Sequence, residues 1–285
     1  MSAASSSSSA LQARQRVADG LREVRLDAGL TLRAVAAAAG WHESKCSRLE
    51  AARTRPSDED IRTWCRVCGA EQQAADLIAA SRAADSTWTQ WRRLERPGLR
   101  RAQEAVIPLW EATQAFRIYS PCLVPSPLQS ESYTRALLRA VRDRRPNPVD
   151  DVEDAVAVRM ARQDVVYEPG REFTVILEEN VLRHRIGGDG ALREQLGHLR
   201  DMTTVPSLTL GIIPFTADRS PLRPVEMFFM FDGAEVQAEL VSGWLRVTQP
   251  TEIAMYAESF ARLSRMAVYG GTARALINGA VRSLG

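Results

Sequence analysis

The sequence predicts an α+β protein in which a small all-α domain of five helices precedes a larger mixed α+β domain. Helix-length segments separated by glycines fill the first third of the chain, and segments rich in β-branched and aromatic residues follow in the second half. A chain of 285 residues is long enough for two domains. We expect a Ser-rich disordered tail at residues 1–9, the all-α domain at 10–84, a helical connector at 85–111 and the mixed domain at 112–285.

Capping residues and glycines divide the all-α domain into helices. The Thr31 side chain can cap the second helix, and Gly40 is suited to end it because glycine readily adopts a left-handed conformation. The two helices around Gly40 have the helix-turn-helix form. The five helices are expected at 11–28, 32–39, 43–51, 58–67 and 71–84. An approximate apolar stripe along the first of them comprises Leu11, Val17, Leu21, Val24 and Leu26.

The third helix carries a row of polar side chains that a core helix would not need. In a helix-turn-helix unit this helix enters the major groove of DNA, and its N-terminal residues meet the base edges. We therefore expect base contacts from His42, Glu43, Ser44 and Arg48, since arginine can pair with guanine and a carboxylate can accept from cytosine. The alternative is a solvated helix face that binds nothing. Contacts to phosphates are expected from Thr31, Lys45, Arg53 and Arg55.

The mixed domain is predicted from four strand candidates and five helical segments. The strand candidates are rich in β-branched and aromatic residues, but their order in a sheet does not follow from the sequence. They cover 173–177, 207–213, 225–231 and 235–240, and the helices are expected at 132–141, 149–166, 191–202, 252–267 and 272–283.

Cysteine spacing raises the question of a metal or redox site. Cys65 and Cys68 stand three residues apart, but the four ligands of a structural zinc site typically come from two such pairs or from added histidines. Here the nearby sequence offers no second pair, only the single cysteine Cys46 and the single histidine His42. On a helix the two cysteines share one face, so we expect core packing, with a thiol sensor as the alternative. No motif of a catalytic nucleophile, phosphate loop or metalloprotease is present, and we expect neither a cofactor nor an enzyme.

No run of 18 or more apolar residues occurs, and the N-terminal segment lacks the charge and apolar core of a secretion signal. We therefore expect a cytoplasmic protein with no membrane partner. Basic residues outnumber acidic residues over residues 1–103, and the reverse holds in the remainder. This distribution is typical of a nucleic-acid-binding module attached to another domain.

The spacing of several residues in the N-terminal domain is that of a known family. They are Leu30-Thr31, Val35-Ala36, Gly40, Ser44, Ser47-Arg48, Glu50 and Arg55-Pro56. With them the domain resembles the Cro/repressor-like (XRE) helix-turn-helix family. The resemblance implies that Arg25 and Glu50 pair and orient the third helix. It also implies a weakened cap at His42, where the family usually has Ser or Thr.

The rest of the chain is similar to actinobacterial Scr1-type antitoxin-like regulators, whose C-terminal region was long a domain of unknown function. The matching segments are Val124-Pro-Ser-Pro-Leu-Gln129, Tyr133-Thr-Arg-Ala136, Arg159-Met-Ala-Arg-Gln163, Phe173-Thr-Val-Ile-Leu-Glu178, Gln195-Leu-Gly-His-Leu199 and Ile213-Pro214. The two resemblances imply a transcriptional regulator that binds double-stranded DNA as a homodimer on a pseudo-palindromic operator. The alternative is an antitoxin-like interaction module that works with a small protein partner encoded nearby and regulates its own operon.

A regulatory domain joined to a DNA-binding domain needs an input signal. A small-molecule effector would require a pocket, and aromatic side chains are common in such pockets. Residues 227–231 form the apolar run Met-Phe-Phe-Met-Phe, and a buried strand is the alternative explanation for this run. The candidate pocket residues are Trp110, Tyr119, Phe229 and Trp244.

Overall fold

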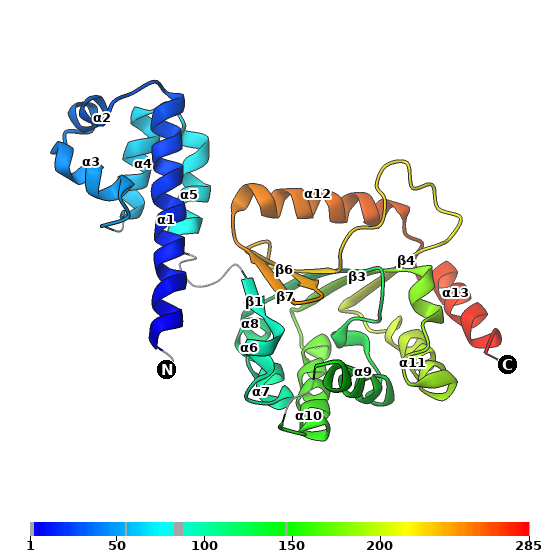
Figure 1. The fold of residues 1–285 in the computed structure, drawn as a ribbon. Helices are drawn as coiled ribbons and strands as arrows, with labels where there is room; N and C mark the ends of the chain where they lie inside the picture. Colours follow the sequence, from blue (N-terminus) through cyan, green and yellow to red (C-terminus); the bar gives the residue numbers. More distant parts are fainter. Residues whose placement is uncertain (1–2, 55, 83–87, 146–147, 285) are drawn as a thin grey trace. The chain divides into compact units, whose positions relative to one another are not determined.

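The computed structural model describes the backbone of residues 3–54, 56–82, 88–145 and 148–284. The chain divides into two compact units (Figure 1). Unit 1 comprises Met1–Thr87 with Val247–Ala254, and unit 2 comprises Trp88–Arg246 with Met255–Gly285. The prediction of an α+β protein with an N-terminal helical domain is confirmed.

The described part of residues 3–82 contains the five expected α-helices. Their apolar faces meet around Trp64, whose indole N–H donates a hydrogen bond of 2.9 Å to the carbonyl of Leu21. Both side chains are fully buried, so this bond ties the first helix to the fourth inside the core. The helices are α1 (Ala3–Asp27), α2 (Leu32–Ala39), α3 (Glu43–Glu50), α4 (Asp58–Val67) and α5 (Ala74–Arg82), the last preceded by the 3₁₀ turn η1 (Glu71–Gln73).

Two details of the first helix differ from the prediction. α1 begins at Ala3, so the backbone of residues 3–9, where we expected a disordered tail, is helical. Serine has only a moderate helix propensity, but a helix that a neighbouring segment has nucleated can extend through it. Leu26 is 56% exposed and does not belong to the apolar stripe, because the buried positions Val17, Leu21 and Val24 follow the helical spacing and Leu26 falls outside it.

Over the described residues of unit 2, seven strands form one sheet in the order β1-β7-β6-β5-β2-β3-β4. β2 is parallel to β3, and β3 is parallel to β4, whereas β5 is antiparallel to both β2 and β6. β1 is antiparallel to β7. The strands are β1 (Trp88–Gln90), β2 (Ala115–Ser120), β3 (Glu172–Glu178), β4 (Leu208–Ile213), β5 (Phe228–Phe231), β6 (Glu235–Leu240) and β7 (Gly243–Val247).

Helices cover both faces of this sheet. In Figure 1, α12 runs along one face, and α9, α10 and α11 lie on the other. The α12 face is packed through Phe228, whose ring lies 5.0 Å from that of Tyr256 and 6.3 Å from that of Phe260. The helices are α6 (Trp91–Glu95), α7 (Leu99–Glu104), α8 (Ile107–Ala112), α9 (Glu131–Arg144), α10 (Val152–Arg162), α11 (Gly188–Met202), α12 (Pro250–Met266) and α13 (Gly270–Arg282). Short 3₁₀ turns are η2 (Ser126–Leu128), η3 (Gln163–Tyr167) and η4 (Glu179–Arg183).

The expected helical connector is part of unit 2. Its first described residues form β1, in which Trp88 is paired with Leu245 of β7, and α6, α7 and α8 follow. Unit 2 therefore begins at Trp88 rather than at residue 112. The prediction missed β1 because three residues are too few to show a strand pattern, and the pairing that defines this strand comes from a distant part of the chain.

Candidate nucleic-acid interface

The turn between α2 and α3 is short and defined by main-chain hydrogen bonds. The hydroxyl of Thr31 accepts from the N–H of Ala34 at 3.2 Å and caps α2, as the sequence predicts. Gly40 ends α2 with a φ of 69°, a conformation that favours glycine, and the N–H of Trp41 donates to the carbonyl of Ala36 at 2.8 Å. These contacts fix the direction in which the chain enters α3.

His42 caps α3 with its ring rather than with a hydroxyl. Nδ1 accepts from the N–H of Ser44 at 3.3 Å and lies 2.8 Å from the Ser44 hydroxyl oxygen. Because Nδ1 accepts from the main chain, the proton of a neutral ring resides on Nε2. The imidazole thus supplies the acceptor that Ser or Thr would otherwise provide, and the expectation of a weakened cap stays a prediction.

The four expected base-contacting side chains share the exposed part of α3. His42, Glu43, Ser44 and Arg48 are all exposed. Arg48 lies one turn after Ser44, and its Nη1 donates to the Ser44 hydroxyl at 3.4 Å. The row thus presents a guanidinium as donor and a carboxylate as acceptor, which are groups that read base edges, while the Ser44 hydroxyl donates to His42 Nδ1. The opposite side of α3 is apolar, and Cys46 and Leu49 are buried in the core there.

A buried ion pair holds α3 against α1. Arg25 Nε donates to Glu50 Oε1 at 2.6 Å, and Nη2 donates to Oε2 at 3.1 Å, so the pair is bidentate. Arg25 Nη1 also donates to the carbonyl of Leu30 at 2.7 Å. The hydrogen bond and charge of Glu50 raise the pKa of Arg25. The pairing implied by the family resemblance is therefore present, and it fixes the C-terminal end of α3.

The expected phosphate-contacting residues differ in their surroundings. Thr31 and Arg53 are exposed, and Arg55 lies outside the described residues. Lys45 instead forms an ion pair with Asp60 of α4, with Nζ 2.5 Å from Oδ1, and its ammonium group lies 4.0 Å from the centre of the Trp41 ring. The charge of Lys45 is therefore engaged within the protein, so its geometry does not favour the predicted phosphate contact.

The three neighbouring cysteines pack in or beside the core of unit 1. Cys46 and Cys65 are buried, and Cys68 is half-buried. Burial raises the pKa of all three thiols, that of Cys65 to about 11. These thiols are neutral near pH 7, and a neutral thiol is a poor nucleophile and metal ligand. The geometry supports core packing over a thiol sensor.

Three of the four expected pocket residues line one cavity of unit 2, whereas the fourth does not. Trp110, Phe229 and Trp244 are in its wall. Tyr119 lies on the opposite face of the sheet, where its hydroxyl donates to Glu178 Oε1 at 2.7 Å and its ring packs 5.8 Å from that of Phe228. Including Tyr119 was wrong because side chains alternate along a strand. The sequence-based prediction also missed the arginines that line this cavity: Arg144, Arg145, Arg159 and Arg162. Arg159 and Arg162 stand three residues apart on α10, and this spacing, which places both on one face of a helix, was a usable signal.

Comparisons with known proteins agree with this division of the chain. Residues 103–279 match the family described as Domain of unknown function (DUF5753), and residues 16–78 match a family described as Helix-turn-helix domain. No curated protein and no solved structure gives a match. Within the described residues, no helix combines the length and apolar character needed to cross a membrane.

Proposed function

The chain belongs to the DUF5753 family and carries an N-terminal helix-turn-helix domain, and we propose that it is a sequence-specific DNA-binding transcriptional regulator. The observation that carries this proposal is the exposed polar row on α3. The row stands directly after the helix-turn-helix turn, and the buried Arg25–Glu50 pair holds the far end of its helix. A helix with a fixed orientation and exposed hydrogen-bonding groups is what groove recognition requires.

In the proposed complex α3 lies in the major groove. Arg48 pairs with the two acceptors of a guanine, and Glu43 accepts from the amino group of a cytosine. His42 and Ser44 complete the row of base contacts at the start of the helix. Thr31 and Arg53 contact phosphates, which contribute affinity without sequence choice.

The remaining parts of the proposal concern assembly and input. We propose that two chains bind a pseudo-palindromic operator together, since a two-fold protein doubles the base contacts and fixes the spacing of the half-sites. Unit 2 then serves as the regulatory part, through a small-molecule effector or a small protein partner. The helix-turn-helix match supports a regulator rather than an enzyme.

Fluorescence anisotropy tests the proposal. The full-length protein is titrated against duplex DNA from upstream of its own gene and against a scrambled duplex, each at two salt concentrations. We expect a clear preference for the upstream duplex, and we expect Arg48→Ala to lose it, because one bidentate arginine–guanine contact contributes about 1–3 kcal/mol of discrimination.

Arg62→Ala is the matched control. Arg62 is an exposed arginine of α4, outside the proposed base-reading row, and its replacement removes the same charge. It should weaken binding to both duplexes equally or not at all. Equally weak binding of the wild-type protein to both duplexes would contradict autonomous recognition and favour the antitoxin-like alternative, in which a protein partner is required.

A further inference from the structure

Unit 2 contains a half-open cavity of about 640 Å³ between the sheet and the helices α6–α10. Its sheet side is formed by residues that alternate along β5 and β6, including Phe229, Phe231 and Gln237. The cavity lies within the usual volume range of small-molecule sites, about 300–1,000 Å³. Aromatic side chains from the helices and from β7 complete much of the wall: Trp91, Trp110 and Trp244.

Two arginines of α10 enter this wall without an acidic partner. Arg159 donates to the side-chain oxygens of Gln103 at 2.9 Å and Gln129 at 3.2 Å, and Arg162 donates to the carbonyl of Gln103 at 3.1 Å. Every acceptor is neutral, and among the described residues neither guanidinium has a carboxylate at ion-pairing distance. Desolvation lowers the pKa of both arginines, and the charge of Arg159 further lowers that of Arg162. The charge of Glu239 acts on Arg159 without a direct ion pair and compensates only part of this positive charge.

A third arginine leaves hydrogen-bond donors unused at the same cavity. Arg145 contacts Glu95 through Nη2 at 2.9 Å, and its guanidinium lies 4.9 Å from the centre of the Trp91 ring. Its Nε and Nη1 atoms are buried, and within the described part of the chain they have no hydrogen-bond partner. The same holds for the indole nitrogen of Trp244. Buried donors without acceptors are costly, so these groups favour a ligand that supplies acceptors.

Acidic groups of the cavity compensate only part of this charge. Glu95 is engaged by Arg145, and Glu226 accepts a hydrogen bond from Tyr256 at 2.8 Å. Desolvation raises the pKa of Glu239, although the charges of Arg159, Arg145 and Arg144 act against this rise. Because Glu239 interacts with Arg144, Arg145 and Arg159, these three arginines lie close to one carboxylate at the cavity.

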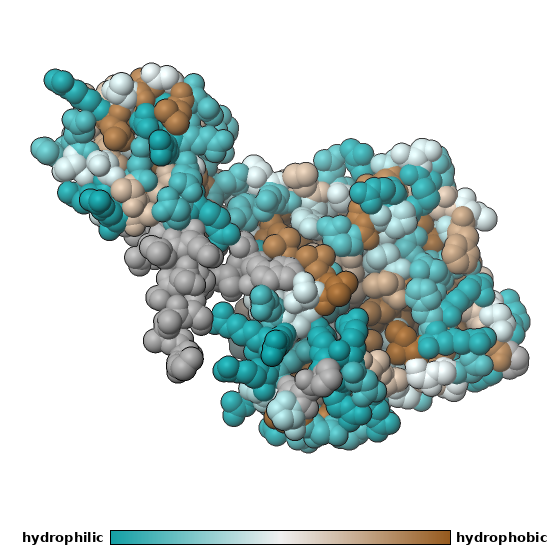
Figure 2. Space-filling view, in the orientation of Figure 1, coloured by the Kyte–Doolittle hydropathy of each residue, from teal (hydrophilic) through white to brown (hydrophobic). Residues whose placement is uncertain are grey.

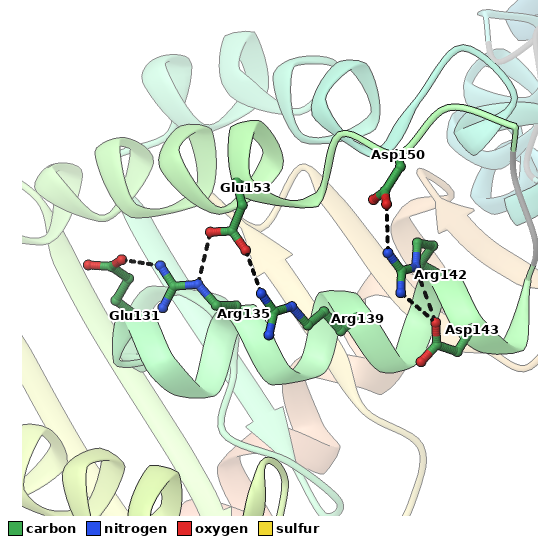
Figure 3. A network of polar contacts seen from close by, with 7 residues as sticks. All are labelled: Glu131, Arg135, Arg139, Arg142, Asp143, Asp150 and Glu153. Carbon is green, nitrogen blue, oxygen red and sulfur yellow. Dashed lines mark hydrogen bonds and ion pairs between the residues drawn. The ribbon is translucent and has the colours of Figure 1, made fainter.

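The surface arginines of α9 have different partners. Arg135 and Arg139 both contact Glu153 of α10, at 2.9 and 3.0 Å, and Arg142 contacts Asp150 at 2.9 Å (Figure 3). On the outer side of the same helix pair, arginines thus meet carboxylates. On the cavity side, Arg159 and Arg162 meet amides instead. This difference favours a bound anion as a direct partner of Arg159 and Arg162.

The rest of the cavity is suited to an apolar body. Trp110 packs against Phe229 and Phe231, and the guanidinium of Arg162 lies 4.8 Å from the centre of the Trp110 ring. Leu240 and Val241 also line the cavity and are exposed. In Figure 2, hydrophobic residues gather on the visible face of unit 2 in the region where Figure 1 draws the β6–β7 hairpin.

We propose that this cavity binds a small organic anion with an apolar ring system. Its carboxylate or similar acidic group is held by Arg145, Arg159 and Arg162, and its ring system packs against Trp110 and Phe229. The indole N–H of Trp244 donates to a polar atom of the ligand. The role of this anion as an effector rests on the proposed regulatory function, whereas its binding to unit 2 does not.

Isothermal titration calorimetry with 1-naphthylacetate and the neutral 1-naphthylacetamide tests the proposal on the full-length protein. The two probes share a ring system and differ in charge. We expect the acid to bind at least about tenfold more tightly than the amide, because charge-assisted hydrogen bonds are the stronger ones. Equal affinity for the two probes, or no binding of either, overturns the proposal.

Variants assign the binding to the cavity. Arg159→Gln and Trp244→Phe should each weaken binding of the acid, the first by about tenfold or more, because each removes a donor while keeping most of the side-chain volume. Arg139→Gln is the matched control, as Arg139 lies on the outer side of α9 and should leave the affinity unchanged. Thermal unfolding confirms that each variant is folded. Unchanged affinity in both folded cavity variants overturns the proposal.

The same proteins separate this inference from the proposed function. Arg48→Ala should lose operator preference and still bind 1-naphthylacetate. If wild-type protein prefers its operator and binds no acid, the regulator stands and the cavity proposal fails. If it binds the acid and no DNA, the cavity proposal stands and the regulator fails.

Discussion

At the scale of single residues, Lys45 shows how a charge on the proposed recognition helix can serve the fold. Its ion pair with Asp60 and its position over Trp41 engage the ammonium group within unit 1. We predict that Lys45→Met leaves the slope of log Kd against log salt unchanged and lowers the free energy of unfolding by about 1–2 kcal/mol. Arg53→Ala, which removes an exposed charge, should reduce that slope by about one. Anisotropy titrations over a salt series measure both slopes. A reduced slope for Lys45→Met would show that Lys45 does contact a phosphate, as the sequence predicts.

Glu50 is the residue whose loss should matter most for the position of α3. Its side chain is 9% exposed and accepts two hydrogen bonds from Arg25, which is 11% exposed. Removing one partner leaves a buried charge without compensation, so Glu50→Gln should lower the free energy of unfolding by about 3 kcal/mol. Urea denaturation measures this change. Glu43→Gln on the exposed side of the same helix should stay within about 0.5 kcal/mol of wild type, and equal effects of the two substitutions would contradict a structural role for the pair.

At the scale of elements, Asp60 joins α3 to α4 and makes this contact sensitive to pH. Burial alone would raise the pKa of Asp60, but hydrogen bonds from Lys45 and Ser57 outweigh it and lower the pKa below its ordinary value of 3.8. A carboxyl group with a lowered pKa in the folded state stabilises the protein above its unfolded pKa. It loses this contribution as the pH falls through the folded value. Asp60→Asn should therefore destabilise the protein at pH 7 and have a smaller effect below pH of about 3.8.

Urea denaturation of Asp60→Asn and wild type at pH 7 and at acidic pH measures this difference directly. Asp58→Asn is the control, since Asp58 stands in the same first turn of α4 and its substitution keeps Lys45 paired. A difference between wild type and Asp60→Asn that stays constant with pH would contradict the proposed ionic link.

The elements also show which parts of the fold local sequence determines. The helices of unit 1 were predictable because caps and glycines mark their ends, as Thr31 and Gly40 do for α2. β2 was missed, although it lies between β5 and β3 in the sheet, because six residues with an arginine in the middle give no clear period. The face occupied by Tyr119 and the convergence of Arg145 and Arg159 depend on strand register and helix packing. Neither can be obtained from local patterns.

At the scale of the whole molecule, thermodynamic linkage relates the proposed base-reading row of unit 1 to the proposed anion site of unit 2, whatever the structural route between them. If 1-naphthylacetate changes the affinity for the operator by a given factor, the operator must change the affinity for the acid by the same factor. We predict a factor in the usual range for coupled sites, about 5–150. Anisotropy with and without saturating acid gives one side of the cycle, and calorimetry with and without operator DNA gives the other.

Two variants test this cycle, one weakened in acid binding and the other in operator recognition. Arg159→Gln should retain operator binding and make it insensitive to the acid, and Arg48→Ala should retain acid binding and make it insensitive to the operator duplex. A factor of one in both directions, with both ligands bound by the wild-type protein, would show that the cavity holds an anion without regulating DNA binding. The regulatory input of unit 2 would then have to come from another surface, and a protein partner would become the favoured source.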